Sequence, residues 1–591
     1  MEKILIPNTS RHDVASFTIL VNDAEIDQAY QVLSITITKE VNKIPAAKIV
    51  IRDGDAAERT FAASNTNDLV PGKKIKIKIG LDGNNAQYFK GIIVKHSIHI
   101  KENGNTQLTI ECKDEAVRMA VGRHSQYFHN LKDSQVIDEL IKKYKDYLSG
   151  NTQATSLTHK EMVQHHISDW DFMLMRAEAN SMMVIADDGN ITVAKPTTSA
   201  AAVLQVAYGS SVVDFEAELN AQDQWNSVEA TSWDYSNQTL FKADTSGVAF
   251  QENGNIKGID LADSLNLKPY ELHHSGHLLE QELQDWADGM MLRSRLAKIR
   301  GRAKFTGFAG VKPGDMVELS GVGERFNGKV YVTAVKQEIG NGMWDTHIQF
   351  GLNPEPYVQL HPDANDLESS GLVGAIHGLQ IGKVVQLQDD PDGQHRILVR
   401  VPVIDKNAQG IWTRVASLDA GSDRGAFFRP ELDDEVILGF VNNDPRDAVV
   451  LGMLHSSAKQ APITAKNAND EKGFTTRSKM HVHFNDNTKT ITIDTPAGNK
   501  ITLDESSMKI EIKDQSNNKI TMEPTGIKLE SPANIDIKAG AVLTLGAGVS
   551  LAISGPALSV KADASVSIEG ATAKLSAQGP TVISGLPVKI N

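Results

Sequence analysis

The last hundred or so residues of this chain repeat a pair of apolar side chains at a nearly fixed short step. The two members of a pair stand two positions apart, as expected of a strand with one apolar face. From Ile527 onward the pairs recur about every eight residues, and upstream of Ile527 the step is nine or ten. A repeat of strand and tight turn is typical of a β-solenoid. We predict that the core of a needle is formed by Ile491, Ile493, Ile501, Leu503, Ile510, Ile512, Ile520, Met522, Ile527, Leu529, Ile535, Ile537, Leu543, Leu545, Leu551, Ile553, Leu558, Val560, Val566 and Ile568.

One such strand turns only two side chains inward, which is too few for a single chain to enclose a core. Three copies wound about one axis would bury both residues of every turn and leave no open sheet edge. The repeat therefore predicts an obligate homotrimer with a C-terminal, triple-stranded β-helix. The alternative is a disordered linker rich in glycine, alanine and serine. A linker has no reason to keep aliphatic residues in register over ten turns.

Composition and charge exclude several other classes of protein. The chain of 591 residues has 40% hydrophobic and 23% charged residues, and its formal charge of −14 argues against a general nucleic-acid binder. Its single cysteine, Cys112, excludes an intramolecular disulfide. The N-terminal residues lack the apolar core of a signal peptide, and no apolar run approaches the ~20 residues needed to span a bilayer. We therefore expect assembly in the cytoplasm, with any export occurring by a route other than a cleaved signal.

Most of the chain upstream of the repeat is expected to be β-structure. Apolar and polar residues alternate between turn clusters over 1–120, and strands return at 315–352. A polar stretch with prolines at 354–370 is typical of a domain boundary. Five short alternating segments within 374–455 then fit a small closed barrel of the OB type.

Helical periodicity is confined to three segments of the first half. The spacing predicts helices within 133–148, within 168–180 and within 275–301, where the glycine at the end of the range should stop the helix. Ser168 or Asp169 is the expected N-cap of the second helix.

The barrel region resembles a known family. Its glycines, prolines and charged residues follow the pattern of the OB module of VgrG proteins, the spikes of type VI secretion systems. The segment after it, 475–505, resembles the neck that leads into the family's β-helix, with Met480 in place of the usual glycine before His481. The matching OB residues are Gly382, Val384, Asp392, Gly393, Arg396, Val399, Trp412, Arg414, Val415, Ala420, Gly421, Gly425, Pro430, Asp434, Glu435, Val436, Phe440, Asp444, Pro445, Val450 and Gly452.

Earlier segments resemble the hub of the same family and of phage tails. Residues 313–351 are similar to the second barrel of the hub, and 162–184 are similar to its signature helix. Asn180 and Ser181 stand where the family commonly has a glycine. The signature is carried by Gln164, Ser168, Asp169, Phe172, Arg176, Ala177 and Glu178.

The resemblance implies a mainly-β, multidomain fold in four parts. Residues 1–370 would form a phage-hub-like domain of two β-barrel-like domains with helical insertions, and 371–456 an OB-fold domain. Residues 457–476 would be a linker or neck, and 477–591 the trimeric, triple-stranded β-helix needle.

The resemblance also implies a mechanical function. A trimer of hubs would connect the tail tube and baseplate proteins of a contractile injection system to a membrane-piercing needle. The needle would carry a PAAR-type tip protein, and possible effector cargo, into target cells, with transient contact to the target membrane. Type VI secretion is favoured. The alternative is the spike of an extracellular injection particle, a tailocin or a phage tail with a cell-wall-degrading role.

Motifs suggestive of nucleotide or calcium binding have simpler explanations. Residues 323–329 match a P-loop, but Val330 replaces the serine or threonine that binds magnesium, and the residues that follow alternate as a strand. Asp389, Asp390 and Asp392 lack the bidentate glutamate of an EF-hand. We expect turns at both places, no cofactor and no catalytic residue.

The histidines form two groups that could suggest a metal. His273, His274 and His277 could place two imidazoles on one helical face, but the sequence offers no third ligand. His481 and His483 would be brought together threefold in a trimer. Period two turns them away from the needle core, however, because the apolar set that alternates with them is Met480, Val482 and Phe484. We therefore predict no metal site.

The C-terminal end of the needle is the expected docking site of a separate tip protein. Three final strands would leave a blunt face with unpaired backbone groups, and an exposed solenoid end normally needs a cap. The predicted docking residues are Pro587, Val588, Ile590 and Asn591.

Overall fold

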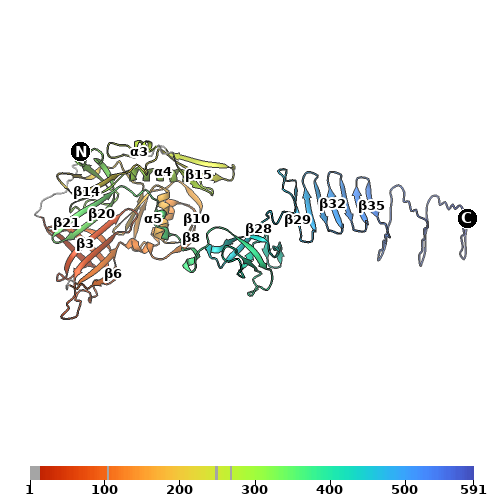
Figure 1. Cartoon of the computed structure of the whole chain (residues 1–591), viewed down its shortest axis with the longest axis horizontal. Helices are drawn as coiled ribbons and strands as arrows, with labels where there is room; N and C mark the ends of the chain where they lie inside the picture. The colour runs from red at the N-terminus through yellow and green to blue at the C-terminus, as the bar shows by residue number, and fades with distance from the viewer. Residues whose placement is uncertain (1–12, 103–105, 246–249, 266–268, 591) are drawn as a thin grey trace. The chain divides into compact units, whose positions relative to one another are not determined.

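The computed structural model describes residues 13–102, 106–245, 250–265 and 269–590. It divides into two compact units (Figure 1). The first is Met1–Leu432 with Ile437–Gly452, and the second is Asp433–Val436 with Met453–Asn591. Among the helices of the described residues, none has the length and apolarity needed to cross a bilayer.

A mixed sheet of 13 strands forms the main body of the first unit, in the order β14-β18-β21-β20-β3-β4-β7-β6-β5-β1-β2, with β13 and β19 branching from β20. Its strands are β1 (Ala15–Val21), β2 (Ala24–Glu25), β3 (Gln31–Glu40), β4 (Ala46–Arg52), β5 (Lys74–Leu81), β6 (Asn84–His99), β7 (Gln107–Lys113), β13 (Ala202–Ala207), β14 (Val212–Leu219), β18 (Ile299–Thr306), β19 (Met316–Ser320), β20 (Gly328–Gly340) and β21 (Met343–Phe350).

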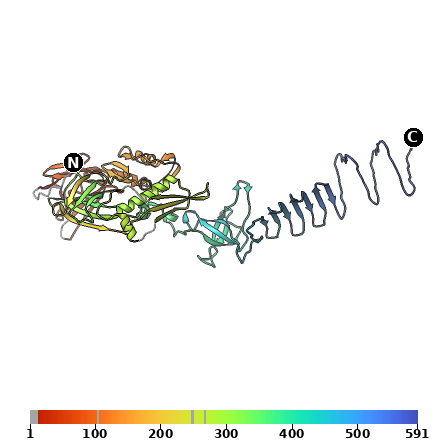
Figure 2. The same ribbon diagram turned by 90° about the horizontal axis from the view of Figure 1, so that it is seen from above.

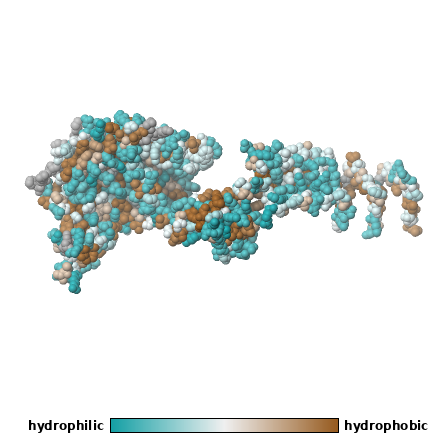
Figure 3. Space-filling model, viewed as in Figure 1, coloured by the Kyte–Doolittle hydropathy of each residue, from teal (hydrophilic) through white to brown (hydrophobic). Residues whose placement is uncertain are grey.

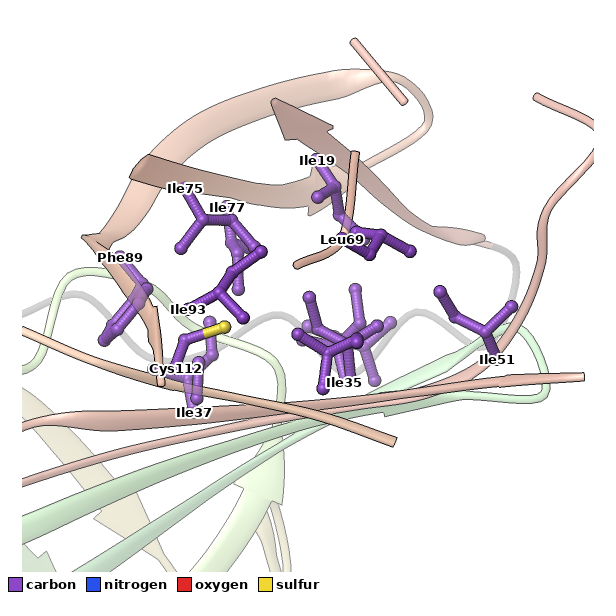
Figure 4. Close-up of a cluster of buried hydrophobic side chains, with 14 of the residues drawn as sticks. Ile19, Ile35, Ile37, Ile51, Leu69, Ile75, Ile77, Phe89, Ile93 and Cys112 are labelled. Carbon is purple, nitrogen blue, oxygen red and sulfur yellow. The ribbon is translucent and has the colours of Figure 1, made fainter. Parts of the chain in front are cut away.

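The sheet folds over two separate cores, so it makes two barrel-like lobes. In the first lobe the inward residues of β1 and β5 face those of β3, β4 and β7, and Ile35, Ile77 and Phe89 are fully buried between them (Figure 4). In the second lobe Phe305 and Phe350 occupy the same kind of position. The two lobes share β20, which pairs with β19 near its start and with β3 from Ala334 onward. The two hub barrels expected from the sequence are therefore two halves of one continuous sheet.

Smaller sheets and helices pack beside the large sheet. Helix α4 contacts β15 and β16, and Figure 2 shows it lying along the hub. These elements are β8 (His124–Lys132), α1 (Asp133–Lys142), β9 (Ser149–Thr152), β10 (Thr158–Ile167), α2 (Asp169–Ala179), β11 (Met183–Asp187), β12 (Asn190–Ala194), β15 (Val228–Asp234), β16 (Thr239–Thr245), α3 (Gly258–Ser264), β17 (Tyr270–His274) and α4 (Glu280–Ala297).

The three predicted helices exist, and one of them ends earlier than expected. Ser168 caps α2, because its side chain accepts a hydrogen bond from the backbone N–H of Asp171 at 3.1 Å. Helix α4 ends at Ala297 rather than at Gly301. The helix ends there because β18 begins at Ile299 and pairs with β14 on one side and β21 on the other. This strand pairing outweighs the helical spacing of the apolar residues.

The proline-bearing stretch after β21 is fastened to the hub. It contains the short helix α5 (Tyr357–Leu360), whose Tyr357 hydroxyl donates to Asp171 at 2.7 Å. Arg123 donates to the carbonyl oxygens of Asp363 at 2.6 Å and Ala364 at 3.0 Å. The segment is therefore ordered by side chains of the hub.

Five strands close the predicted OB barrel. They are β22 (Gln380–Gln386), β23 (Ile397–Arg400), β24 (Ile411–Val415), β27 (Glu435–Phe440) and β28 (Ala448–Met453), and a small hairpin of β25 (Ala420–Gly421) and β26 (Arg424–Gly425) projects after β24. A Cβ on Gly382 would lie 2.5 Å from Val399 Cγ1, so only glycine fits the barrel interior at that position.

The second unit is built on an antiparallel sheet in which each strand pairs with the next. Its strands are β29 (Glu471–Thr475), β30 (His481–Asn485), β31 (Thr490–Asp494), β32 (Lys500–Asp504), β33 (Lys509–Lys513), β34 (Lys519–Glu523) and β35 (Gly526–Glu530).

Candidate trimer interface

The predicted apolar pairs stand directly opposite one another in the second unit's sheet. Ile491 faces Leu503, and Ile493 faces Ile501. The same register continues through every strand to β35, where Met522 faces Ile527 and Ile520 faces Leu529. Residues paired across an antiparallel ladder share one face of the sheet. The first ten predicted core residues therefore form one continuous apolar face.

Within one chain this face is largely uncovered. Most of its large side chains from Ile493 to Met522 are between 37% and 44% exposed, although they are apolar, and Ile520 is partly buried. Soluble monomers rarely leave a contiguous apolar surface of this extent in water. The face is therefore the candidate site at which copies of the chain meet.

The opposite face of the same sheet is polar and charged. Glu511 lies opposite Thr502 and Thr521, and its pKa is lowered by a hydrogen bond from Lys509 at 2.5 Å. At the end of the sheet Lys519 pairs with Glu530 at 2.9 Å, which raises the pKa of the lysine. The sheet is thus amphipathic, with charges only where solvent can reach them.

The neck histidines lie on the polar face. His481 and His483 stand opposite Asp494 and Thr492, and His481 Nδ1 is 3.3 Å from Asp494. Val482 and Phe484 stand opposite Ile493 and Ile491 and so extend the apolar face. The predicted alternation of this segment is confirmed. Within the described ranges, no three histidine, cysteine, aspartate or glutamate side chains are gathered as metal ligands usually are.

One residue of this face was not predicted from the sequence. Phe474 in β29 stands opposite Val482, inside the segment expected to be a linker. Phe474 is a single aromatic residue and is not part of a sequence repeat, so no pattern in the sequence indicated its role. Only the pairing of β29 with β30 shows on which face of the sheet it lies.

Residues 531–590 keep the eight-residue period, but the structure assigns no hydrogen-bonded strand pairs among them. In this range the structure describes bends at 532–533, 540–541, 548–549, 555–556, 563–564, 571, 578–579 and 586–587, with no strand pairing between them (Figure 2). The predicted core residues from Ile535 to Ile568 are between 51% and 80% exposed. An extended segment with regular bends and no partner in its own chain is what each chain of a three-stranded helix contributes.

The predicted docking residues lie in the last of these segments. Val588 is 44% and Ile590 83% exposed, while Asn591 lies outside the described residues.

The other candidate motifs have structural roles. The P-loop-like segment is the hairpin turn between β19 and β20, as expected. Asp390 orders the β22–β23 turn by accepting hydrogen bonds from Arg396 and from the backbone N–H of Gln394. His273, His274 and His277 do not share a helical face, because the first two lie in β17. That segment pairs in parallel with β15, so the sheet and not local periodicity decides its conformation.

A β-rich hub, a closed OB barrel and an amphipathic sheet with an uncovered apolar face define a phage-baseplate-type hub-spike protein. The family comparisons agree with this class. A model described as the type VI secretion system/phage-baseplate injector OB domain matches residues 380–455. A model of the phage baseplate V C-terminal trimerisation domain matches 490–566, which contains the predicted core residues from Ile491 to Val566. The Alg8 N-terminal domain model matches 11–341, more than half of the chain, so the chain belongs to the Alg8 N-terminal domain family.

Solved structures with partial similarity are phage-tail and secretion proteins. A tail protein of Neisseria meningitidis is 13% identical with a TM-score of 0.43, and covers 57% of this chain and 97% of its own. A 43 kDa tail protein of a Shewanella oneidensis prophage is 11% identical with a TM-score of 0.42, covering 57% and 98%. An Escherichia coli component of the type VI secretion system is 11% identical with a TM-score of 0.36, covering 74% and 99%. No curated protein matches the chain by sequence.

Proposed function

We propose that the chain works as the homotrimeric hub-spike of a contractile injection machine. The hub would bind the tail tube and baseplate, and the needle would pierce a target membrane while carrying a tip protein and effector cargo. The observation that carries this proposal is the continuous apolar face from β30 to β35 together with the trimerisation-domain match, which covers β31 to β35.

The physical argument for three copies is the uncovered surface. Each large aliphatic side chain gains roughly 1.5–3 kcal/mol when it leaves water. One chain obtains only part of this gain, because in the described part of the chain no second layer covers the apolar face of the sheet. Three layers arranged around an axis cover one another, and the bent segments after Glu530 then find strand partners in the neighbouring copies.

The test is the mass of the purified full chain in solution. Size-exclusion chromatography with light scattering is expected to give about three times 64.3 kDa. A stable monomer with an intact β signal in circular dichroism would contradict the proposal.

Type VI secretion is the machine that the VgrG resemblance favours, and the OB-domain match names both type VI and phage-baseplate injectors. The location of the assembled particle separates the candidates. Sheathed particles anchored at the cell envelope, seen by electron cryotomography, are expected for type VI. Free sheathed particles in the medium would instead identify an extracellular system or tailocin.

We also propose that the chain itself does no catalysis. Only a short segment separates β28, which ends at Met453, from β29, which begins at Glu471, so no domain-sized insert lies between the barrel and the needle. Purified protein is expected to turn over neither peptidoglycan, lipid nor nucleotide, and measurable turnover would favour the alternative of a cell-wall-degrading tail hub.

A further inference from the structure

The needle sheet carries a pocket at its first strands. The pocket has a volume of about 390 Å³ and is bounded by β29 to β32 and by the segment with Pro462 and Ile463. All residues of its wall belong to the second compact unit. Figure 3 shows that the visible side of the needle sheet is mainly hydrophilic. The polar side chains in the wall of this pocket, called here the neck pocket, are those of Thr475, His481, His483, Thr492, Asp494 and Lys500.

The strand register places these polar side chains on one face of the sheet. Asp494 stands opposite His481 on one side and Lys500 on the other. His483 stands opposite Gly473, which has no side chain to fill the space beside the imidazole. This is the face opposite to the proposed trimer interface, so the neck pocket remains open to solvent when three copies meet.

Several polar groups of the wall have no partner. In the part of the chain that the structure describes, the His483 ring, the Lys500 ammonium and the Thr492 hydroxyl make no hydrogen bond or ion pair. Asp494, the only carboxylate of the wall, is already engaged, because it lies 3.3 Å from His481 Nδ1. An ammonium group has three donors and no acceptor, and an imidazole has at least one donor. The free groups of the wall are therefore mainly donors, and they fit a ligand rich in acceptors.

The chain around the neck pocket is basic, although the whole protein is acidic. Between Ser456 and His483 five residues are lysine or arginine and two are aspartate or glutamate. Lys513 stands directly opposite Lys500 on the same face. Like charges in this position destabilise a sheet unless an anion screens them. A local positive potential attracts anions even to a protein whose formal charge is −14, and it repels metal cations.

We propose that the neck pocket binds a phosphate group. Its oxygens accept hydrogen bonds from the His483 ring, the Lys500 ammonium and the Thr492 hydroxyl, and charge-assisted bonds of this kind are stronger than neutral ones. The phosphate belongs either to a soluble ion or to a lipid headgroup, since the pocket opens to solvent. The inference does not depend on the proposed hub-spike function, because one chain supplies the whole wall.

Equilibrium dialysis of the purified full chain against radiolabelled inorganic phosphate tests the site. Saturable binding of a single phosphate per chain is expected, and His483→Gln/Lys500→Gln should weaken it about tenfold or more, because hydrogen bonds to a charged ligand are lost. The matched control, His455→Gln/Lys528→Gln, removes the same residue types from positions outside the wall and should retain the wild-type affinity.

Asp494→Asn is a test with the opposite sign. It removes the carboxylate that repels an anion and should tighten phosphate binding by roughly fivefold. A residue that only supported the fold of the sheet would weaken binding when replaced, so weaker binding by Asp494→Asn would contradict the proposal.

A second arm separates the two sources of phosphate. Co-sedimentation uses phosphatidylcholine vesicles with and without phosphatidic acid, whose headgroup is a phosphate monoester. Binding to the phosphatidic acid vesicles that is lost in His483→Gln/Lys500→Gln supports the site and identifies a lipid headgroup, whereas binding of inorganic phosphate alone supports it and identifies a soluble ligand. Saturable binding in neither arm, or equal weakening by the two double variants, would overturn the site. A monomer that still binds phosphate would overturn the trimer and leave the site standing.

Discussion

At the scale of single residues, a buried charge cluster joins three helices of the hub. Asp133, at the start of α1, has almost no exposed surface and is hydrogen-bonded by Arg176 of α2 and by His159 Nε2 at 2.8 Å. Burial raises the pKa of Asp133, but hydrogen bonds from His159 and Arg176 outweigh it and hold the pKa well below its usual range. Arg176 also reaches Glu282 of α4 at 3.3 Å. The cluster therefore ties α1, α2 and α4 together.

Replacing this carboxylate tests the cluster. Asp133→Asn should lower the local unfolding free energy of α1 and α2 by at most roughly 3–5 kcal/mol at neutral pH, because the buried Arg176 loses the closer of its two carboxylate partners and keeps only Glu282. The measurement is hydrogen exchange of peptides from the two helices. The control, Glu229→Gln, breaks the exposed pair with Lys242 and should cost no more than about 1 kcal/mol.

The pH dependence has a definite sign. The folded-state pKa of Asp133 is depressed, so its contribution is complete above the unfolded-state value of roughly 4 and is lost as pH falls further toward the folded-state value. The difference between wild type and Asp133→Asn should therefore be constant from pH 7 to about 5 and shrink below about 4. A difference that does not change with pH would show that Asp133 acts by shape alone.

At the scale of elements, one residue of β33 and one residue of β32 can be used to compare the two faces of the needle sheet. Ile512 lies on the apolar face, opposite Ile501 and Ile520, and Thr502 lies on the polar face opposite Glu511. Ile512→Lys would bring three ammonium groups into the interface between copies, where each loses its hydration without gaining a partner. It should shift the protein from trimer to monomer or aggregate in light scattering.

Thr502→Lys introduces the same charge on the other face, beside the Glu511 carboxylate, and should leave the trimer mass unchanged. Equal behaviour of the two variants would contradict the assignment of the apolar face as the interface.

The sequence was most informative where a pattern is local and repeated. Alternation of apolar and polar residues was enough to predict β3, β5 and the strands of the OB barrel. The spacing of the apolar pairs was enough to predict the apolar face of β31 to β35. Prediction from the sequence failed where the structure depends on pairing between residues that are distant in the sequence. The long strand β6 follows β5 after a two-residue turn and carries a register shift near Ile93, which interrupts its alternation. The strand identity of His273 and His274 likewise depends on β15, and the charge partners of Asp133 lie 26 and 43 positions away.

At the scale of the whole molecule, the needle's segments change character along the chain. Up to Glu530 each strand has five residues and pairs with a strand of the same chain. Beyond it the repeat is about eight residues, and the described segments pair with no other described strand of the chain. Backbone groups of these segments that leave water need partners, and such partners can come from other copies of the chain. The last part of the needle should therefore depend most strongly on trimer formation.

We propose that the segment with Val588 and Ile590 binds a separate tip protein. Val588 and Ile590 alternate with Lys589, so they share one side of the final segment and are exposed together in the single chain. Deleting residues 586–591 is expected to leave the trimer mass intact and to abolish capture of a PAAR-type tip protein in a pull-down. Val588→Asp should do the same by charging the apolar side of each of the three ends, whereas Lys589→Gln, on the other side, should retain capture. Undiminished capture by the deleted chain would place the docking site on the hub or the OB barrel instead.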